Sequence, residues 1–416
     1  MDELEVWLDD ATLAAEPRRV GVLSRATARG REVVRFRYTE DWLRNRSSAF
    51  DLDPELPLTP GDFFARAGAS LHGVFRDSAP DRWGRVLMER READHARREA
   101  RAPRALTEWD FLAGVNDDAR MGALRLQERR SSRWIDDRAP GVPPAARLRE
   151  LEAAARAVEG DGAAGSAELS EWLRLLVVPG SSLGGARPKA SFRDADGSLW
   201  LAKFPARDDR RDVGAWEFLA HELARAAGVD VSEARLERFA GRHHTYCSRR
   251  FDRAGASRRM YASAMTLLQR DDGDAASYLE LAETLQMQGD AEHVGADLQQ
   301  LYRRVAFAIL VGNRDDHLRN HGFLRGMTGW RLAPAFDVNP DPDRTDHALA
   351  IDEHDTRPTI ETLRSTARFY RLGEARARTI ESEIRAAVRR WRAVATSIGL
   401  VASEIEALAA VIDVAR

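Results

Sequence analysis

The segment from residue 297 to residue 339 constrains the fold more than any other part of the chain. It begins with an apolar helical pattern over residues 297–311, in which leucine, valine and isoleucine share one face. A polar run over residues 313–320 follows at the end of this helix, and burying so many polar groups is unfavourable unless they bind something. A strand pair with a turn at 326–329 then leads to Asp337. The predicted order is helix, polar loop, hairpin and aspartate.

Two residues of the polar run, Asp315 and Asn320, have the D-x-x-x-x-N spacing of a protein-kinase catalytic loop. In that arrangement Asp315 orients the attacking hydroxyl, Asn320 holds a magnesium ion, and Asp337 is a second metal ligand. Magnesium prefers hard oxygen ligands and shares them with substrate phosphate. The spacing alone occurs by chance in many chains, where it marks only a solvated loop. The hairpin and the second aspartate favour the kinase interpretation.

Lysine is nearly absent, because only Lys189 and Lys203 occur among 64 lysines and arginines. A compact ammonium pairs with phosphate where a planar guanidinium would not fit, although chance survival in an arginine-rich chain is the alternative. Lys203 lies on a predicted strand after a glycine-containing loop, as does the phosphate-pairing lysine of a kinase, and Glu217 on the next helix is its natural partner. Lys189 follows Gly184 and Gly185, which let backbone amides approach phosphate closely.

Composition places the chain among ordinary globular proteins. Its 416 residues predict two or three cores, and 44% hydrophobic residues exclude a disordered chain. A single cysteine, Cys247, excludes an internal disulfide and a multi-cysteine zinc site, and it fits a reducing compartment. The net charge of -3 offers no overall basic surface for nucleic acid. The acidic start and the absence of a long apolar run predict a cytoplasmic protein without a signal peptide or membrane span.

Local patterns predict an α+β protein in which a strand-containing half precedes a helical half. Short strands are expected within residues 1–40. The segment Asp77-Ser78-Ala79-Pro80 offers a capping residue and an early proline, so a helix is expected to start there and to continue over Arg82–Arg97 as an arginine-rich helix. A hairpin is expected across the turn at 194–197, followed by an amphipathic helix over 212–227.

The segment Gly180–Gly184 also matches G-x-S-x-G, the nucleophile elbow of α/β-hydrolases. That elbow needs a helix directly after the serine, which Gly185 and Pro188 disfavour. A Walker A loop is excluded because Ala190, and neither serine nor threonine, follows Lys189. The hydrolase interpretation is therefore the weaker one.

Several segments together resemble the HipA-type serine/threonine kinases of bacterial toxin–antitoxin systems. These segments are Phe75–Arg85, Ser182–Lys189, Ala202–Pro205, Arg250–Arg253, Asn313–Asn320 and Leu332–Asp337. The resemblance implies a two-lobed, protein-kinase-like (HipA-like) fold of the α+β class. Its expected parts are an N-terminal subdomain over residues 1–140, a mixed α/β N-lobe with the glycine/serine loop over 145–250, and a mainly helical C-lobe with the catalytic loop over 251–416.

The resemblance also implies a function. It implies ATP- and Mg²⁺-dependent phosphorylation of a protein substrate, in this family often an aminoacyl-tRNA synthetase, with Phe251 and His317 among the nucleotide-binding residues. It implies autophosphorylation at Ser182, or at its neighbour Ser181, and a HipB-like DNA-binding antitoxin as a separate chain. Unlike ordinary protein kinases, the chain has no H-R-D motif, and Val338 follows Asp337.

Two other functions remain open at this point. A small-molecule kinase would use a similar two-lobed fold and the same phosphate chemistry. A non-catalytic co-repressor would act through a DNA-bound partner and would not need the carboxylates.

Overall fold

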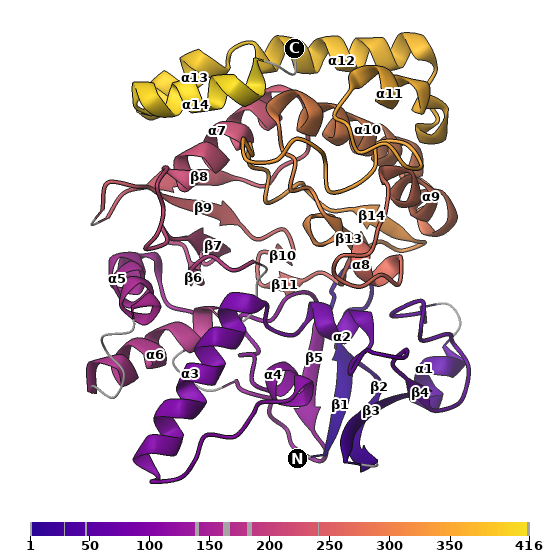
Figure 1. Ribbon diagram of the computed structural model, residues 1–416. Coiled ribbons are helices and arrows are strands. Elements are labelled where there is room, and N and C mark those ends of the chain that lie inside the picture. The colour runs from indigo at the N-terminus through magenta and orange to yellow at the C-terminus, as the bar shows by residue number, and fades with distance from the viewer. Residues whose placement is uncertain are drawn as a thin grey trace. The chain divides into compact units, whose positions relative to one another are not determined.

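The computed structural model describes residues 2–28, 30–45, 48–137, 141–160, 167–180, 185–239 and 241–413. The chain forms two compact units (Figure 1). The first unit comprises residues 1–208 and 252–262, and the second unit comprises residues 209–251 and 263–416. Over the described residues, no helix combines the length and the apolar character that a bilayer crossing requires.

A five-stranded antiparallel sheet with the order β4-β3-β2-β1-β5 forms the N-terminal part of the first unit (Figure 1). Alternate residues of β1, namely Leu4, Val6 and Leu8, are buried, as expected for a strand with one face on a core. The strands predicted within residues 1–40 are thereby confirmed. The sheet consists of β1 (Glu3–Leu8), β2 (Arg18–Ala28), β3 (Arg31–Tyr38), β4 (Phe63–Phe64) and β5 (Leu124–Glu128).

The arginine-rich helix predicted over Arg82–Arg97 is confirmed, but its predicted start at Asp77–Pro80 is wrong. Asp77 is the last residue of α2, and the arginine-rich helix α3 begins at Arg82, whose N–H is accepted by the carboxylate of Asp81 at 2.6 Å. Pro80 explains the difference, because a proline disfavours helical backbone at the residue before it. The proline therefore separates α2 from α3. The helices of the first unit are α1 (Glu40–Arg44), α2 (Gly73–Asp77), α3 (Arg82–Arg98), α4 (Glu108–Ala113), η1 (Ala145–Arg147), α5 (Leu148–Glu159) and α6 (Ala167–Gly180).

The predicted hairpin is confirmed. β6 (Lys189–Arg193) pairs antiparallel with β7 (Leu199–Lys203), and Gly197 in the turn has φ +82°. Helix α6 packs against β6 and against the neighbouring helices α3 and α5. The hairpin is therefore supported by helices of its own unit.

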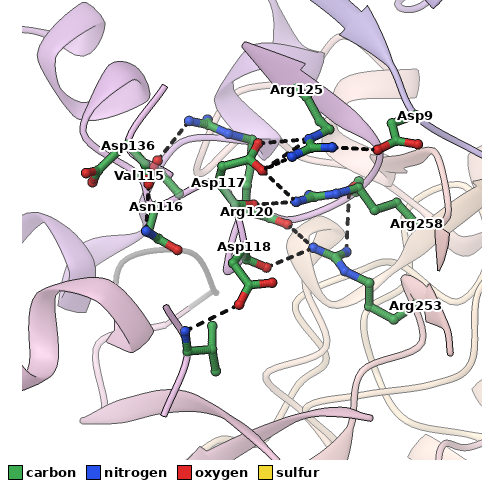
Figure 2. A network of polar contacts seen from close by, with 12 residues as sticks. Asp9, Val115, Asn116, Asp117, Asp118, Arg120, Arg125, Asp136, Arg253 and Arg258 are labelled. Carbon is green, nitrogen blue, oxygen red and sulfur yellow. Dashed lines mark hydrogen bonds and ion pairs between the residues drawn. The ribbon is translucent and has the colours of Figure 1, made fainter. Parts of the chain in front are cut away.

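Residues 252–262 belong to the first unit, and arginines in this segment connect it to that unit through hydrogen bonds and ion pairs (Figure 2). Arg258 donates to the backbone oxygen of Asp117 at 2.6 Å and to its carboxylate at 3.1 Å. Arg125 donates to the same carboxylate, so Asp117 lies between two guanidinium groups. Burial alone would raise the pKa of Asp117, but Arg258 and Arg125 outweigh it and hold the pKa below its usual range.

Two further arginines bind backbone carbonyls in the same region. Arg253 donates to the backbone oxygen of Arg120 at 2.7 Å, and the carboxylate of Asp252 accepts the N–H of Gly122 at 2.8 Å. The guanidinium of Arg120 is fully buried and donates to three backbone oxygens at 3.0–3.1 Å. We call Asp117, Arg120, Arg125, Arg253 and Arg258 the arginine network. The short ribbon that it holds consists of β10 (Arg253–Ala254) and β11 (Ser257–Arg258), and β12 (Tyr261–Ser263) follows.

The second unit is mainly helical. Its central helix, α10, is buried along most of its length and packs against α9 and α12, while α7 packs against α12 and α13 (Figure 1). The strands are the antiparallel pairs β8 (Ala234–Glu237) with β9 (Thr245–Arg249) and β13 (Gly322–Arg325) with β14 (Trp330–Leu332). The helices are α7 (Val213–Ala226), α8 (Ala264–Leu267), α9 (Tyr278–Gln288), α10 (Val294–Val311), η3 (Leu318–Asn320), α11 (Ile360–Ser365), η4 (Ala367–Tyr370), α12 (Glu374–Val388), α13 (Trp391–Ile398) and α14 (Ala402–Ile412).

Replacing Asp117 with alanine should destabilise the first unit, because the substitution leaves buried guanidinium groups without their carboxylate. We expect the free energy of unfolding to fall by about 3–5 kcal/mol, the typical cost of breaking a buried ion pair from one side. Chemical denaturation followed by tryptophan fluorescence measures this change. The control is Glu150→Ala, which removes the exposed partner of Arg147 and should cost at most about 1 kcal/mol. Equal losses in both variants would contradict a structural role for the arginine network.

Candidate active site

The predicted site residues fall on both units. Those in the first unit are Gly185, Lys189 and Lys203, and those in the second unit are Glu217, Phe251, Asp315, His317, Asn320 and Asp337. Ser181, Ser182 and Gly184 lie outside the described residues. The convergence of the lysines with the aspartates therefore stays a prediction, and each half of the site is described within its own unit.

The predicted catalytic loop begins where α10 ends, at Gly312. This residue has φ +76°, and a Cβ there would lie 1.9 Å from Cγ1 of Val411 on α14. Only glycine meets both conditions, so the chain turns sharply out of the helix. The carbonyl of Gly312 then accepts the N–H of Asp341 at 2.8 Å, and Oδ1 of Asn313 accepts the N–H of Asn339 at 3.1 Å. These hydrogen bonds hold the catalytic loop against the segment that follows Asp337.

Asp315 and Asn320 lie at the two ends of this loop and are bonded to each other. Nδ2 of Asn320 donates to the backbone oxygen of Asp315 at 3.1 Å, which fixes the amide of a residue that is only 8% exposed. Because the nitrogen is used in this bond, the amide oxygen of Asn320 remains as an acceptor. The carboxylate of Asp315 is 51% exposed. The loop therefore offers one amide oxygen and one carboxylate, both hard ligands of the kind magnesium prefers.

Asp337 has an unusual backbone. Its φ of +58° lies in the left-handed region, which non-glycine residues rarely adopt and which is concentrated at functional sites. Phe336 beside it stacks on Phe251, with ring centroids 5.2 Å apart. Burial and then the charges of Glu217 and Asp337 raise the pKa of Tyr246 well above its usual value. Three of the predicted residues of the second unit, Glu217, Phe251 and Asp337, are therefore brought into one neighbourhood.

A buried polar cluster that sequence reasoning missed lies directly beneath the catalytic loop. The carboxylate of Asp316 accepts a hydrogen bond from the hydroxyl of Tyr278 at 2.7 Å, and this hydroxyl lies 3.2 Å from Nδ1 of His347. Nε2 of His321 lies 3.2 Å from the other carboxylate oxygen, without the alignment of a hydrogen bond. We call Asp316, Tyr278, His321 and His347 the loop cluster. Its members come from α9, the loop and the segment after Asp337, so no local pattern marks them.

The electrostatics of the loop cluster keep Asp316 charged. Burial alone would raise its pKa, but the nearby His321 and the bond from Tyr278 outweigh burial and hold the pKa below its usual range. Burial, followed by Asp316, raises the pKa of Tyr278 well above its usual value, so the phenol remains a donor. Burial lowers the pKa of His347 to about 4, so its imidazole is neutral at pH 7.

In the first unit, the two lysines of the chain are cross-strand partners. Lys189 on β6 lies directly opposite Lys203 on β7, so both side chains are on one face of the hairpin. Nζ of Lys189 also lies close to Gly185, where an added Cβ would be only 2.8 Å from it. Two ammonium groups on one face, beside a glycine backbone, form an arrangement that suits an anion such as phosphate.

Residues at the start of α3 form hydrogen bonds with Gly185, at the end of the glycine-containing loop. The sequence analysis did not predict this contact. The carboxylate of Asp81 accepts the N–H of Gly185, and the N–H of Trp83 donates to the carbonyl of Gly185 at 3.3 Å. Nε1 of Trp83 donates to the backbone oxygen of Lys189 at 3.1 Å. The N-terminal segment Phe75–Arg85 therefore contributes directly to the geometry around the lysines.

The hydrolase alternative does not fit the described elements. Helix α6 ends at Gly180, and strand β6 begins at Lys189. A nucleophile elbow has the opposite order, with a strand before the turn and a helix after it.

The loop cluster predicts a pH dependence of stability. Between about pH 6.5 and pH 4, His347 binds a proton in the unfolded chain but not in the folded one, so the free energy of unfolding falls as the pH falls. The loss should reach about 3 kcal/mol at pH 4. Denaturant titrations at pH 7, 6, 5 and 4 measure it. His347→Asn should lose less stability than the wild type over this range, whereas His72, whose pKa is also lowered to about 4, contributes equally in both proteins. Identical slopes would contradict the assignment.

Comparisons with known proteins identify the family. The model of the HipA N-terminal domain matches residues 4–127, and that of the HipA-like C-terminal domain matches residues 181–394. A Haemophilus influenzae protein named "Putative kinase" is 29% identical over an aligned stretch of 145 residues, and the match covers 30% of this chain and only 42% of that relative.

One solved structure agrees in fold over nearly the whole chain. A chain of the Shewanella oneidensis MR-1 complex of HipA, HipB and operator DNA matches with a TM-score of 0.67 and 17% identity, over 99% of this chain and 96% of that one. The Helicobacter pylori proinflammatory kinase CtkA matches with a TM-score of 0.44 and 16% identity, over 56% of this chain and 89% of that one. The predicted α+β, HipA-like fold is confirmed. The C-terminal family model alone spans more than half of the residues, and the chain belongs to the HipA family.

Proposed function

We propose that the chain is an ATP- and magnesium-dependent protein kinase that transfers the γ-phosphoryl group to a serine or threonine hydroxyl. The observation that carries this proposal is the catalytic loop, in which Asp315 exposes its carboxylate while Asn320 is fixed with its amide oxygen available. The strained backbone of Asp337 and its neighbourhood with Glu217 support the same function. Phosphoryl transfer needs positioning and charge neutralisation more than covalent chemistry, and these residues suit both tasks.

The donor set fits a magnesium ion. Asn320 and Asp337 would hold it, and the small number of protein ligands suits an ion that keeps its own waters and shares phosphate oxygens. When bound, magnesium neutralises negative charge on the phosphate oxygens. Asp315 orients the hydroxyl for attack and accepts its proton. Lys203 and Lys189 bind phosphate oxygens from the hairpin that carries them both.

The protein substrate and the partner are part of the same proposal. The similar Shewanella oneidensis complex contains HipB and operator DNA, which supports a HipB-like antitoxin as a partner of this chain. We further propose an aminoacyl-tRNA synthetase as the substrate class and Ser182, or Ser181, as the site of autophosphorylation. Phosphoproteomics after brief induction, compared with an Asp315 variant, identifies the substrate, and a phosphorylated metabolite in place of a protein would indicate the small-molecule kinase.

Asp315→Asn should abolish most phosphoryl transfer while the fold is retained. Losing the group that accepts the hydroxyl proton typically costs about 100- to 10,000-fold in rate. Purified protein incubated with γ-labelled ATP and magnesium should become labelled on Ser182 or Ser181, as mapped by mass spectrometry, and the variant should not. Asp343→Asn is the matched control, because this nearby carboxylate is 73% exposed and paired with Arg211. Equal labelling of the wild type and Asp315→Asn would overturn the assignment, and operator binding by an inactive chain would favour the co-repressor.

Replacing either lysine should weaken nucleotide binding. We expect Lys189→Met and Lys203→Met each to raise the Kd for ATP by about 10- to 100-fold, since each removes a charged partner of phosphate. Isothermal titration measures the Kd, and melting without ligand checks the fold. Arg207→Gln, which changes an exposed cation elsewhere in the first unit, should bind ATP like the wild type. Unchanged binding by both methionine variants would exclude the hairpin as the phosphate site.

A further inference from the structure

The exposed carboxylate of the catalytic loop has a cationic partner. Nη2 of Arg344 lies 2.8 Å from Oδ1 of Asp315, and the two side chains are 50% and 51% exposed. Both residues belong to the second unit. No motif indicated Arg344, because it is one arginine among many in a loop without periodic pattern. The contact is nevertheless made with the carboxylate that orients the attacking hydroxyl in the proposed reaction.

The loop that carries Arg344 is attached to the catalytic loop by its backbone. The carbonyl of Arg344 accepts a hydrogen bond from Nη1 of Arg314, and the carbonyl of Arg314 accepts the N–H of Ala348 at 2.9 Å. Upstream, the N–H of Asp341 donates to Gly312 at 2.8 Å. These bonds on both sides of residue 344 fix its Cα relative to Asp315. The backbone path of the loop therefore places Arg344 within reach of Asp315.

The neighbouring cations of the catalytic loop have other tasks. Arg314 donates to the backbone oxygens of Asp341 and Arg344. Arg319 forms two hydrogen bonds of 2.7 Å with the carboxylate of Asp272. Both lysines of the chain lie in the first unit, so the second unit has none. Among the cations that the structure describes around this loop, Arg344 is the one that forms an ion pair with Asp315.

The guanidinium of Arg344 keeps donors for a ligand. Nη2 faces Asp315, and Nε lies 3.5 Å from a carboxylate oxygen of Asp341. Among the described residues, Nη1 donates no hydrogen bond. A carboxylate that orients an attacking hydroxyl lies beside the phosphoryl group in transfer, so a cation touching that carboxylate is close to the developing charge.

We propose that Arg344 is a catalytic residue that binds the phosphoryl group during transfer while it holds Asp315 in place; this inference rests on the proposed function. In the step, the bond between the γ-phosphorus and the β,γ-bridging oxygen breaks, and a bond from the substrate hydroxyl oxygen to phosphorus forms. The hydroxyl proton passes to Asp315, and ADP leaves with the electron pair of the broken bond. Arg344 stabilises the negative charge on the equatorial oxygens. Because that charge develops in the transition state, Arg344 acts on the rate more than on ATP binding.

The test compares Arg344→Gln and Arg344→Lys with the wild type in single-turnover labelling by γ-labelled ATP, with the Kd for ADP measured alongside. Arg344→Gln should slow transfer by about 100- to 1,000-fold, as does the loss of one transition-state donor elsewhere, and change the Kd for ADP less than about threefold. Arg344→Lys should transfer at least about tenfold faster than Arg344→Gln, because lysine retains the charge, although it lacks the planar fork of arginine. Arg357→Gln, whose arginine is 75% exposed and paired with Asp355, is the matched control and should transfer at the wild-type rate.

Three outcomes would overturn the inference. A rate equal to or higher than that of the wild type in Arg344→Gln would indicate that the ion pair shields Asp315 instead of assisting transfer. Parallel losses of rate and ADP binding, without rescue by lysine, would indicate a structural role. A wild type that binds ADP but transfers no phosphoryl group would overturn the proposed function itself, and the inference with it.

Discussion

The catalytic loop depends on one buried carboxylate, that of Asp316. A carboxylate removed from water is costly unless it is paired, and Tyr278 and His321 supply the partners. Because the side chains of adjacent residues diverge, an inward Asp316 directs Asp315 outward, and their side chains are 8% and 51% exposed. Two adjacent aspartates look equivalent in the sequence. The buried partners decide which of them can reach a substrate.

Local patterns predicted the elements that surround the site. The helix before the loop, the hairpin after it and the β6–β7 hairpin follow from periodicity and turn residues, which act over a few neighbouring positions. The start of α3 was predicted wrongly because Pro80 can either open a helix or separate two helices, and the local sequence does not distinguish these cases. Composition singled out Lys189 and Lys203, and the structure places them opposite each other on the β6–β7 hairpin.

Contacts between distant segments could not be predicted in this way. Tyr278 and His347 meet Asp316 from other elements, and Arg344 meets Asp315 from a loop. None of these residues has a distinctive spacing, and in a chain with so many arginines a single functional one is hidden among structural ones. Their roles depend on loop paths, which are set by backbone bonds formed only in the folded chain.

In this arginine-rich chain, arginine and lysine side chains have different roles. Arg120 is fully buried and Arg304 is buried, and burial lowers the pKa of each to about 10, so both remain charged at neutral pH. A lysine in such a position starts from a lower pKa, and an equal shift would bring it to about 8, close enough to neutrality to lose part of its charge. Arginine also reaches several carbonyls at once, as Arg120 does, whereas lysine offers a point charge. Buried cations that bind several carbonyls therefore favour arginine, and the two lysines lie opposite each other on the β6–β7 hairpin, the site that we propose for phosphate.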